Sequence, residues 1–246
     1  MTKKIGSTAD FGVDGDASPE MYRLIMDDAK ATLNQIEDYV KTAGCDHVGT
    51  FGGDHEGGIQ HQQVPDEIAP CIAAIMESGH EIKNYLEIGV AAGGTTVIMN
   101  RFLNPDKIVL IDDNKHPKHH IRHYNFDNNG VPESKRVEII GHSQSPGAVA
   151  MAYEEGPEYD LIFIDGDHTY SGCRGDVDRY LSMLADGGFL VLHDTALPEW
   201  GVMAVCSELK KDKRLEFVGE YLSKKHAKPL GVGLFRKAGK GKNEDI

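Results

Sequence analysis

Short apolar runs alternate with longer amphipathic segments over most of the chain. Five of these runs lie at residues 84–90, 107–112, 136–141, 159–165 and 189–193. Apolar runs of this length are typical of parallel strands that are covered on both faces. The segments between them carry apolar residues at helical spacing and predict helices at 95–103, near 117–126, near 145–155, at 172–184 and at 199–211. The pattern predicts an α/β fold with a doubly wound, mainly parallel sheet.

Two further strand-like runs, 215–222 and 231–236, close the pattern without a helix-length segment between them. Strands that are joined directly favour antiparallel pairing. We expect this pair at one edge of a seven-stranded, Rossmann-like sheet. The sheet domain is predicted to span residues 84–237, and residues 238–246 form a charged tail.

An N-terminal extension, residues 1–83, precedes this domain. Its first residues, 1–17, are rich in Gly, Asp and Ser and are predicted to be mobile. The sequence Ser18–Glu20 is typical of a helix start, and apolar spacing extends this helix to about residue 43. A second helix is predicted at 64–79. Between the two helices, residues 44–63 contain six glycines and three histidines, and this long segment is either a binding loop or a simple connector.

The stretch from Asn84 to Arg101 combines a strand, a glycine turn and a helix start. Gly89 and Gly93 let the backbone adopt positive φ and let a ligand approach the chain closely. The helix that follows presents free N–H groups to a polar ligand. The stretch therefore predicts a nucleotide-type ligand above this turn. The four-residue glycine spacing differs from the G-x-G-x-x-G pattern of dinucleotide sites.

Glu87, Gly89, Gly93 and Thr95 form the pattern E-x-G-x-x-x-G-x-T. This pattern resembles motif I of the class I methyltransferases that depend on S-adenosylmethionine (SAM), and the resemblance covers residues 84–237. It implies that these four residues bind the cofactor, with Glu87 beside its methionine part.

The same resemblance assigns roles to residues at later strand ends. Asp112, which ends the second strand, would accept hydrogen bonds from the ribose hydroxyls, because a carboxylate can take both donors. Asp113 competes for this role, since one residue of register decides which side chain faces the ligand. His142 and Ser143, just after the third strand, would contact adenine.

Acids and histidines gather where the fourth and fifth strands end. Asp165, Asp167 and His168 follow the fourth strand, and His193 and Asp194 follow the fifth. Because ligands of open α/β sheets bind at the carboxyl ends of the strands, these side chains are expected to share one site. Carboxylates clustered in this way repel one another unless a cation, a proton or a basic group lies between them. A divalent metal ion is a natural solution.

The D-G-D-H-x-Y and H-D patterns at these strand ends resemble macrolide- and sugar-modifying O-methyltransferases, some of which bind Mg²⁺. The resemblance implies Asp165 and Asp194 as metal ligands. His193 takes the place of the usual paired acid, which favours a metal that accepts imidazole. In the alternative interpretation, these residues cap the strands and contact the cofactor without a metal, so that Asp165 belongs to the cofactor site.

Methyl transfer to a hydroxyl needs a group that removes the hydroxyl proton. His168 is the first candidate, because a neutral imidazole suits that task near pH 7. Asp167 and His193 are the alternates, and a structural hydrogen bond in the turn is the other interpretation of His168. Trp200 either lines a substrate pocket or packs against a helix.

A polar segment with four histidines follows the second strand. The spacing of its histidines allows metal binding, but a solvated surface helix is the preferred prediction because basic residues are interleaved. The residues concerned are His116, His119, His120 and His123, with Lys115, Lys118 and Arg122 among them.

Composition narrows the function classes. The formal net charge of −13 opposes binding to nucleic acid or to an anionic membrane. The start of the chain lacks the apolar core of a secretory signal, and no run approaches the ~20 apolar residues of a membrane span. Four widely spaced cysteines without a C-x-x-C pair indicate a reduced, cytoplasmic chain.

Together these features predict a SAM-dependent methyltransferase that acts on a hydroxyl group of a small molecule. Mg²⁺ or another divalent cation is a second cofactor in one of the two interpretations of the clustered acids. The alternative functions are a nicotinamide-dependent oxidoreductase and a non-catalytic cofactor-binding protein. No nucleic-acid or membrane partner is expected, and a homo-oligomer is left open.

Overall fold

A computed structural model describes residues 32–42, 44–45, 59–225 and 229–239. The predicted helix start at Ser18, the glycine-rich beginning of the chain, most of the 44–63 segment and most of the charged tail lie outside these residues. Residues 32–42 are helical, as predicted for the later part of the N-terminal helix. Within the predicted loop, β1 (Gly44–Cys45) pairs in parallel with β2 (Ile59–Gln60).

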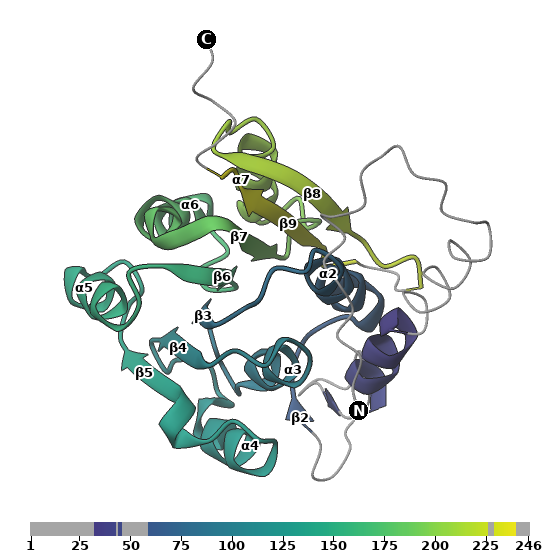
Figure 1. Ribbon diagram of the computed structural model, residues 1–246, viewed down its shortest axis with the longest axis vertical. Coiled ribbons are helices and arrows are strands. Elements are labelled where there is room, and N and C mark those ends of the chain that lie inside the picture. The colour runs from purple at the N-terminus through teal and green to yellow at the C-terminus, as the bar shows by residue number, and fades with distance from the viewer. Residues whose placement is uncertain (1–31, 43, 46–58, 226–228, 240–246) are drawn as a thin grey trace.

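A seven-stranded sheet forms the centre of the described structure (Figure 1). Its strands are β3 (Asn84–Ile88), β4 (Lys107–Asp112), β5 (Arg136–Ile140), β6 (Tyr159–Ile164), β7 (Leu184–His193), β8 (Leu215–Tyr221) and β9 (Val232–Lys237). They lie in the order β5-β4-β3-β6-β7-β9-β8. Strands β3 to β7 are parallel, whereas β9 pairs antiparallel with both β7 and β8. The predicted fold class is confirmed, including the antiparallel pair at one edge.

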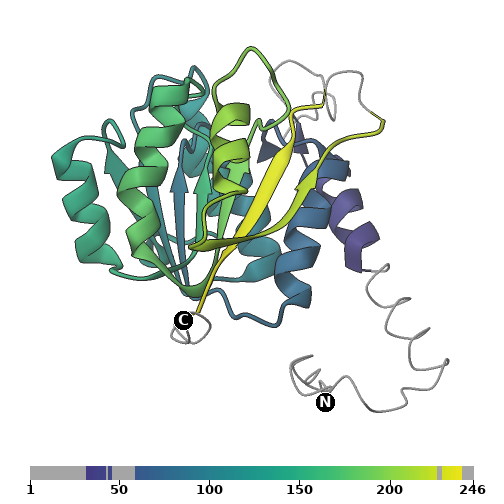
Figure 2. The same cartoon turned by 90° about the horizontal axis from the view of Figure 1, so that it is seen from above.

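Helices cover both faces of the sheet (Figures 1 and 2). On one face, residues 32–42, α2 (Pro65–Glu77), α3 (Gly94–Leu103) and α4 (Arg122–Asn128) pack against strand residues such as Tyr85 and Leu110. On the other face, α5 (Pro146–Glu155), α6 (Tyr170–Tyr180) and α7 (Val202–Leu209) pack against the intervening residues, such as Leu86 and Val109. This alternation is the two-residue period of strands that are buried on both sides.

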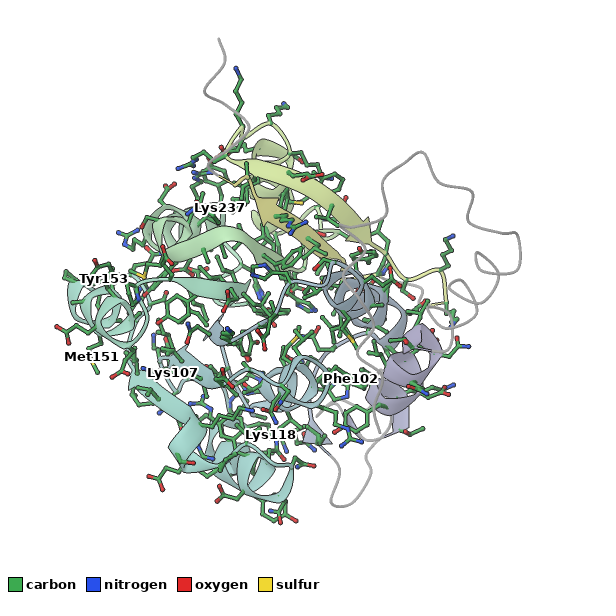
Figure 3. All side chains as sticks on the ribbon, in the orientation of Figure 1. Phe102, Lys107, Lys118, Met151, Tyr153 and Lys237 are labelled. Atoms are coloured by element: carbon green, nitrogen blue, oxygen red, sulfur yellow. The ribbon has the colours of Figure 1, made fainter. Side chains whose placement is uncertain are left out.

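The predicted N-terminal extension shares its core with the sheet. Glu67 of α2 is fully buried and accepts hydrogen bonds from the backbone N–H groups of Ser223 and Gly231, both at 2.8 Å, which ties the helix to the edge pair. Phe102 of α3 is labelled in Figure 3. Its ring meets Tyr39 of the preceding helix edge to face, with ring centroids 5.4 Å apart. The described part of the extension therefore packs as one layer of the sheet domain.

The boundary between α6 and β7 differs from its predicted position. β7 begins at Leu184, so it includes the Asp186-Gly187-Gly188 sequence that is predicted to end a helix. The pairing of β6 with β7 shifts register between Tyr159 and Leu161, which accommodates this segment. Aspartate and glycine are weak strand formers, and they conceal this strand start in the sequence.

The described helices are short, and α2 has 13 residues. None of them, within the ranges given above, has both the length and the apolar character needed to cross a lipid bilayer.

Candidate active site

The glycine turn between β3 and α3 is held tightly by its own neighbours. Gly89 has φ +84°, and a Cβ atom at this position would lie 2.0 Å from the backbone oxygen of Asp165. Gly93 has φ +81° and precedes α3, and a Cβ atom there would lie 2.5 Å from Cε1 of Phe126. Both glycines are therefore required by the fold itself, in addition to any role in admitting a ligand.

Asp112 ends β4 and fixes the glycine turn. Its Oδ2 atom accepts hydrogen bonds from the backbone N–H groups of Val90, at 2.8 Å, and Ala91, at 2.9 Å. Its Oδ1 atom accepts the N–H of Asn114 at 2.7 Å and lies 2.9 Å from Nη2 of Arg122. Both oxygens of the predicted ribose acceptor are thus occupied by the protein.

Arg122 is a structural residue of the site that the sequence prediction missed. Its side chain is 3% exposed, so the prediction of a solvated helix is wrong at this position. Its Nε atom donates to the backbone oxygen of Ala91 at 2.9 Å, and Asn125 donates from Nδ2 to the oxygen of Ala92 at 2.8 Å. The three- and four-residue spacing of Arg122, Asn125 and Phe126 on one helix face is the signal that could have indicated a buried face.

A cleft of about 410 Å³ opens at the carboxyl ends of the parallel strands. Its volume lies in the range of small-ligand sites, ~300–1,000 Å³. Asp113 lines this cleft, and its carboxylate, 36% exposed, pairs with Lys115 at 2.7 Å. The hydrogen bond from Lys115 lowers the pKa of Asp113. Five further residues that are predicted to contact the cofactor also line the cleft: Gly89, Asp112, His142, Ser143 and Asp165.

Ser143 is held in place by a buried acid below the cleft. Its Oγ atom donates to Oδ1 of Asp176 in α6 at 2.7 Å, and the hydroxyl of Tyr180 donates to its backbone oxygen at 2.5 Å. Asp176 is fully buried, and burial raises the pKa of its carboxyl. The loop after β5, which is predicted to contact adenine, is therefore anchored to α6.

Glu87 lies below the glycine turn and is not part of the cleft wall. Its Oε2 atom accepts hydrogen bonds from the hydroxyls of Tyr85 and Thr96, both at 2.7 Å. Burial raises the pKa of its carboxyl to about 8, despite these hydrogen bonds. The predicted cofactor residue Thr95 faces a smaller cavity beside the turn.

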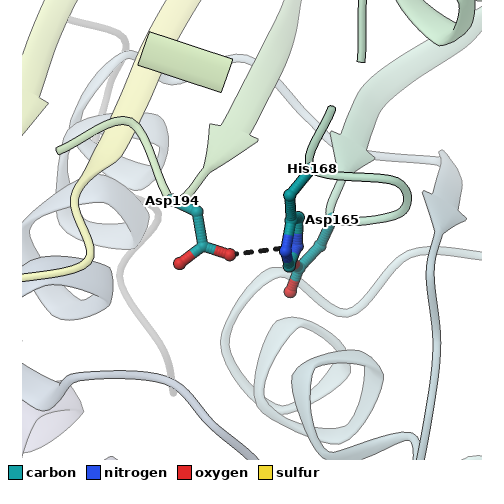
Figure 4. A group of neighbouring side chains, drawn as sticks. All are labelled: Asp165, His168 and Asp194. Carbon is teal, nitrogen blue, oxygen red and sulfur yellow. Dashed lines mark hydrogen bonds and ion pairs between the residues drawn. The ribbon is translucent and has the colours of Figure 1, made fainter. Parts of the chain in front are cut away.

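Two carboxylates and two imidazoles meet where β6 and β7 end, and we call Asp165, His168, His193 and Asp194 the acid–histidine cluster. Nε2 of His168 lies 3.3 Å from Oδ1 of Asp165 and 3.1 Å from Oδ2 of Asp194 (Figure 4). Nδ1 of His193 lies 3.3 Å and 3.1 Å from the same two oxygens. Each of these carboxylate oxygens therefore contacts both imidazoles, as predicted for side chains that share one site.

The charges within the cluster shift one another's pKa. Burial alone would lower the pKa of His168, but its hydrogen bond with Asp165 and the charges of Asp165 and Asp194 raise it. Burial also opposes the charge on His193, and the same two carboxylates raise its pKa far above the usual value. Burial would raise the pKa of Asp165, and the neighbouring imidazoles, His193 first, lower it. The carboxylates and the imidazoles of the cluster therefore each stabilise the charged form of the other.

The cluster has the donor set of a metal site. One ligand atom from each of Asp165, His168 and Asp194 lies within 4.8 Å of the others. Oδ1 of Asp194 and Nε2 of His193 are buried without a hydrogen-bond partner among the described residues. Asp194 also has φ +64°, a strained conformation for a residue other than glycine and one that is typical of functional sites. Carboxylate oxygens with imidazole nitrogens suit a divalent transition metal, so the residues fit such an ion.

Asp167 and Trp200 border the cluster. Asp167 is exposed in the cleft, and its Oδ1 atom accepts the N–H of Thr169 at 2.9 Å. The ring of Trp200 stacks on the imidazole of His168, with centroids 4.2 Å apart and planes inclined by 24°. Gly201 donates its N–H to the backbone oxygen of His168 at 2.9 Å, which holds the two segments together. The stacking orients His168 towards the carboxylates, a role that the sequence did not indicate for Trp200.

Comparison with known proteins identifies the central part of the chain. Residues 86–195 match the model of a protein family that is described as a methyltransferase domain. Residues 86–195 form a methyltransferase domain. The prediction of a methyltransferase is thereby confirmed for these residues, in preference to the nicotinamide alternative. The matched stretch contains the glycine turn and the acid–histidine cluster.

A curated relative of this methyltransferase domain is the uncharacterized protein R132 of Acanthamoeba polyphaga mimivirus, which is 24% identical over 136 residues. The match covers 52% of this chain and 59% of the length of that protein. The relative therefore adds no activity to the comparison.

Solved methyltransferases share the fold. The O-methyltransferase TomG from Streptomyces achromogenes, in complex with SAM, is 16% identical with a TM-score of 0.56, over 70% of this chain and 81% of that chain. An O-methyltransferase from Bacillus cereus, in complex with SAH, is 13% identical with a TM-score of 0.57, over 93% of this chain and 94% of that chain. At these identities the likeness concerns the fold alone.

Proposed function

We propose that this methyltransferase transfers the methyl group of SAM to a hydroxyl group of a small molecule, beside a divalent cation held by the acid–histidine cluster. The observation that carries the proposal is the position of Asp165. This residue lines the cleft above the glycine turn, and its Oδ1 atom also belongs to the cluster. The cofactor site and the cation site would therefore share a wall, where methyl donor and acceptor can meet.

The cleft supports the cofactor part of the proposal. Gly89 and Ala91 of the glycine turn line the cleft, and Asp113 offers a partly exposed carboxylate to the ribose hydroxyls. We assign the ribose contact to Asp113, because the oxygens of Asp112 are engaged by the turn and by Arg122. SAM supplies a methyl group that is already electrophilic, so the protein must align an acceptor oxygen and remove its proton.

The cluster supports the cation part of the proposal. Asp165, His168, His193 and Asp194 would hold the ion, and a cation lowers the pKa of a hydroxyl that it coordinates. Imidazole ligands bind metals in their neutral form, so cation and proton compete for Nε2 of His168. The two imidazoles favour a transition metal over Mg²⁺, which prefers oxygen ligands.

The proton acceptor is assigned to the cleft side of the cluster. With the cation on Nε2 of His168, that nitrogen cannot accept a proton, so Asp167 is the first candidate because its carboxylate is exposed in the cleft. His168 is the alternative and would act as the base only when the ion is held by the other cluster residues. Asp167→Asn distinguishes the two candidate bases. Asp167 does not contact the cluster, so this variant should retain the cation and lose activity only if Asp167 is the base. Loss of a general base lowers kcat by roughly 10²–10⁴-fold. An unchanged kcat in this variant would leave His168 as the base.

Two binding measurements test the proposed function. Isothermal titration calorimetry should show binding of S-adenosylhomocysteine (SAH), the demethylated cofactor, and metal analysis should show a divalent ion that EDTA removes together with methyl transfer. A folded sample that gives no heat with SAM or SAH would rule out the cofactor. Full activity in EDTA, with no ion in the protein, would rule out the catalytic cation.

The remaining predictions concern the acceptor and its setting. A small molecule fits the strongly acidic chain better than nucleic acid does, because a net charge of −13 repels phosphates. Sugars, phenols and macrolides form the first acceptor panel. A cytoplasmic location and self-association also stay predictions.

A further inference from the structure

A small cavity lies beside the glycine turn, under the segment that precedes α2. This segment, from β2 to Gln63, crosses the N-terminus of α3 (Figure 1). A Cβ atom on Gly94 would lie 2.2 Å from the backbone oxygen of Gln60, so the segment rests directly on the first turn of α3. The cavity between them has a volume of about 40 Å³. That space admits one polar end group and not a nucleoside.

Gln63 lines this cavity and carries an acceptor atom that is unpaired within the described residues. The residue is 1% exposed and lines the cavity. Its backbone N–H donates to Nδ1 of His61 at 3.1 Å, and its Nε2 atom donates to Oγ1 of Thr95 at 3.0 Å. Its Oε1 atom is buried and has no hydrogen-bond partner in the described part of the chain. Because an unpaired buried carbonyl is costly, this oxygen is poised for a donor from a ligand.

The small cavity adjoins the larger cleft. Both are lined by the same five residues: Gln62, Gly89, Ala91, His116 and Asp165. A ligand with a nucleoside in the cleft can therefore extend a short polar arm past the glycine turn into the small cavity. The arm must carry a donor for Oε1 of Gln63.

The surroundings suit an α-amino acid end. The first turn of α3 has no side-chain cap, so its N–H groups and the nearby Lys118 favour a carboxylate. Oε1 of Gln63 is a hydrogen-bond acceptor, and it therefore favours an ammonium group. SAM ends in a group that carries both charges.

We propose that Gln63 binds the α-ammonium group of SAM through Oε1, so that a residue of the N-terminal extension completes the cofactor site. Thr95 acts as the positioning residue, because its hydroxyl fixes the amide of Gln63. The inference rests on the proposed function, since it requires SAM as the methyl donor.

Gln63→Met tests the contact, because methionine keeps the length of the side chain and lacks the acceptor. Calorimetry compares three probes: SAH, decarboxylated SAM, which keeps the ammonium group, and 5′-methylthioadenosine, which lacks the whole amino acid end. Loss of a hydrogen bond to a charged group weakens binding by roughly 10- to 100-fold. We expect this loss for the first two probes and unchanged affinity for 5′-methylthioadenosine. Gln63→Glu, which keeps an acceptor, should bind SAH at least as tightly as the wild-type chain.

Three outcomes would overturn the inference. Equal weakening for all three probes would indicate a general disturbance of the cleft, and weakening for SAH alone would indicate contact with the carboxylate. Wild-type affinity of Gln63→Met for SAH would exclude the contact. If the wild-type chain binds none of the probes, the proposed function fails instead, so the two failures are distinguishable. Urea unfolding of each variant checks that the fold is retained.

Discussion

Arg122 and Asp112 form a buried ion pair behind the glycine turn, with Nη2 and Oδ1 2.9 Å apart and side chains that are 3% and 8% exposed. Asp112 accepts the N–H groups of Val90 and Ala91, and Arg122 donates to the oxygen of Ala91. The ion pair therefore holds the glycine turn through two backbone N–H groups and one backbone oxygen of the turn. It links α4 and β4 to the floor of the cofactor cleft.

Arg122→Met should strongly destabilise the fold. The substitution leaves the carboxylate of Asp112 buried without its cationic partner, and breaking a buried pair in this way typically costs about 3–5 kcal/mol. Urea unfolding of the variant and the wild-type chain measures the change. Adding Asp112→Asn to Arg122→Met removes the uncompensated charge and should restore part of the stability. A single variant that unfolds at the wild-type urea concentration would show that the pair is not important for stability.

Asp113→Asn should change cofactor affinity, whereas Asp112→Asn should change the stability of the fold. Asp113 is partly exposed in the cleft and pairs with the exposed Lys115. Asp113→Asn should weaken SAH binding roughly 10-fold, because it removes a charged hydrogen-bond acceptor. The same substitution should leave the free energy of unfolding unchanged. Asp112→Asn should lower the unfolding free energy, because it loosens the glycine turn. Calorimetry and urea unfolding on both variants measure the two effects. Wild-type SAH affinity in Asp113→Asn would contradict our ribose assignment.

The features of this site that can be predicted from the sequence are those that depend on the spacing of neighbouring residues. The apolar strands and the glycine turn follow from residue spacing, and the acids and histidines at two strand ends follow from the rule that parallel strands end at one edge. The choice between Asp112 and Asp113 depends on Arg122, which lies in another element and looks like a surface residue in the sequence. The stacking of Trp200 on His168 likewise depends on how two loops pack, which no local pattern encodes.

Gly93 shows how packing changes the design of an experiment. Gly93 is predicted to bind the cofactor, so Gly93→Val is an obvious substitution for blocking the ligand. The structure places Phe126 2.5 Å from the added Cβ and gives Gly93 φ +81°, so a bulkier residue also strains the fold. Loss of binding in that variant would therefore not distinguish a damaged site from a damaged fold, whereas the Asp113 and Gln63 variants do.

Glu87 should make stability depend on pH between about 4.5 and about 8, its ordinary and its raised pKa. In that range the folded chain holds a proton on Glu87 that the unfolded chain has lost. The free energy of unfolding therefore falls as pH rises, by up to about 1.4 kcal/mol per pH unit. Glu87→Gln keeps an acceptor for Tyr85 and Thr96 and should remove this contribution. Unfolding at several pH values compares the two slopes, and equal slopes would show that Glu87 is ionised in the folded chain.

Metal content should depend on Asp194 and not on Asp167. Asp194→Asn removes a carboxylate from the acid–histidine cluster while keeping a residue type that tolerates φ +64°. This variant should lose the divalent ion, measured by metal analysis of purified protein, and should remain folded. Asp194→Ala should lose the ion as well and also lose stability, because alanine carries the strain of a left-handed backbone, about 1–2 kcal/mol. Asp167→Asn is the matched control, since Asp167 bonds to the N–H of Thr169 and not to the cluster. An ion retained in Asp194→Asn, or lost in Asp167→Asn, would place the cation elsewhere in the cleft.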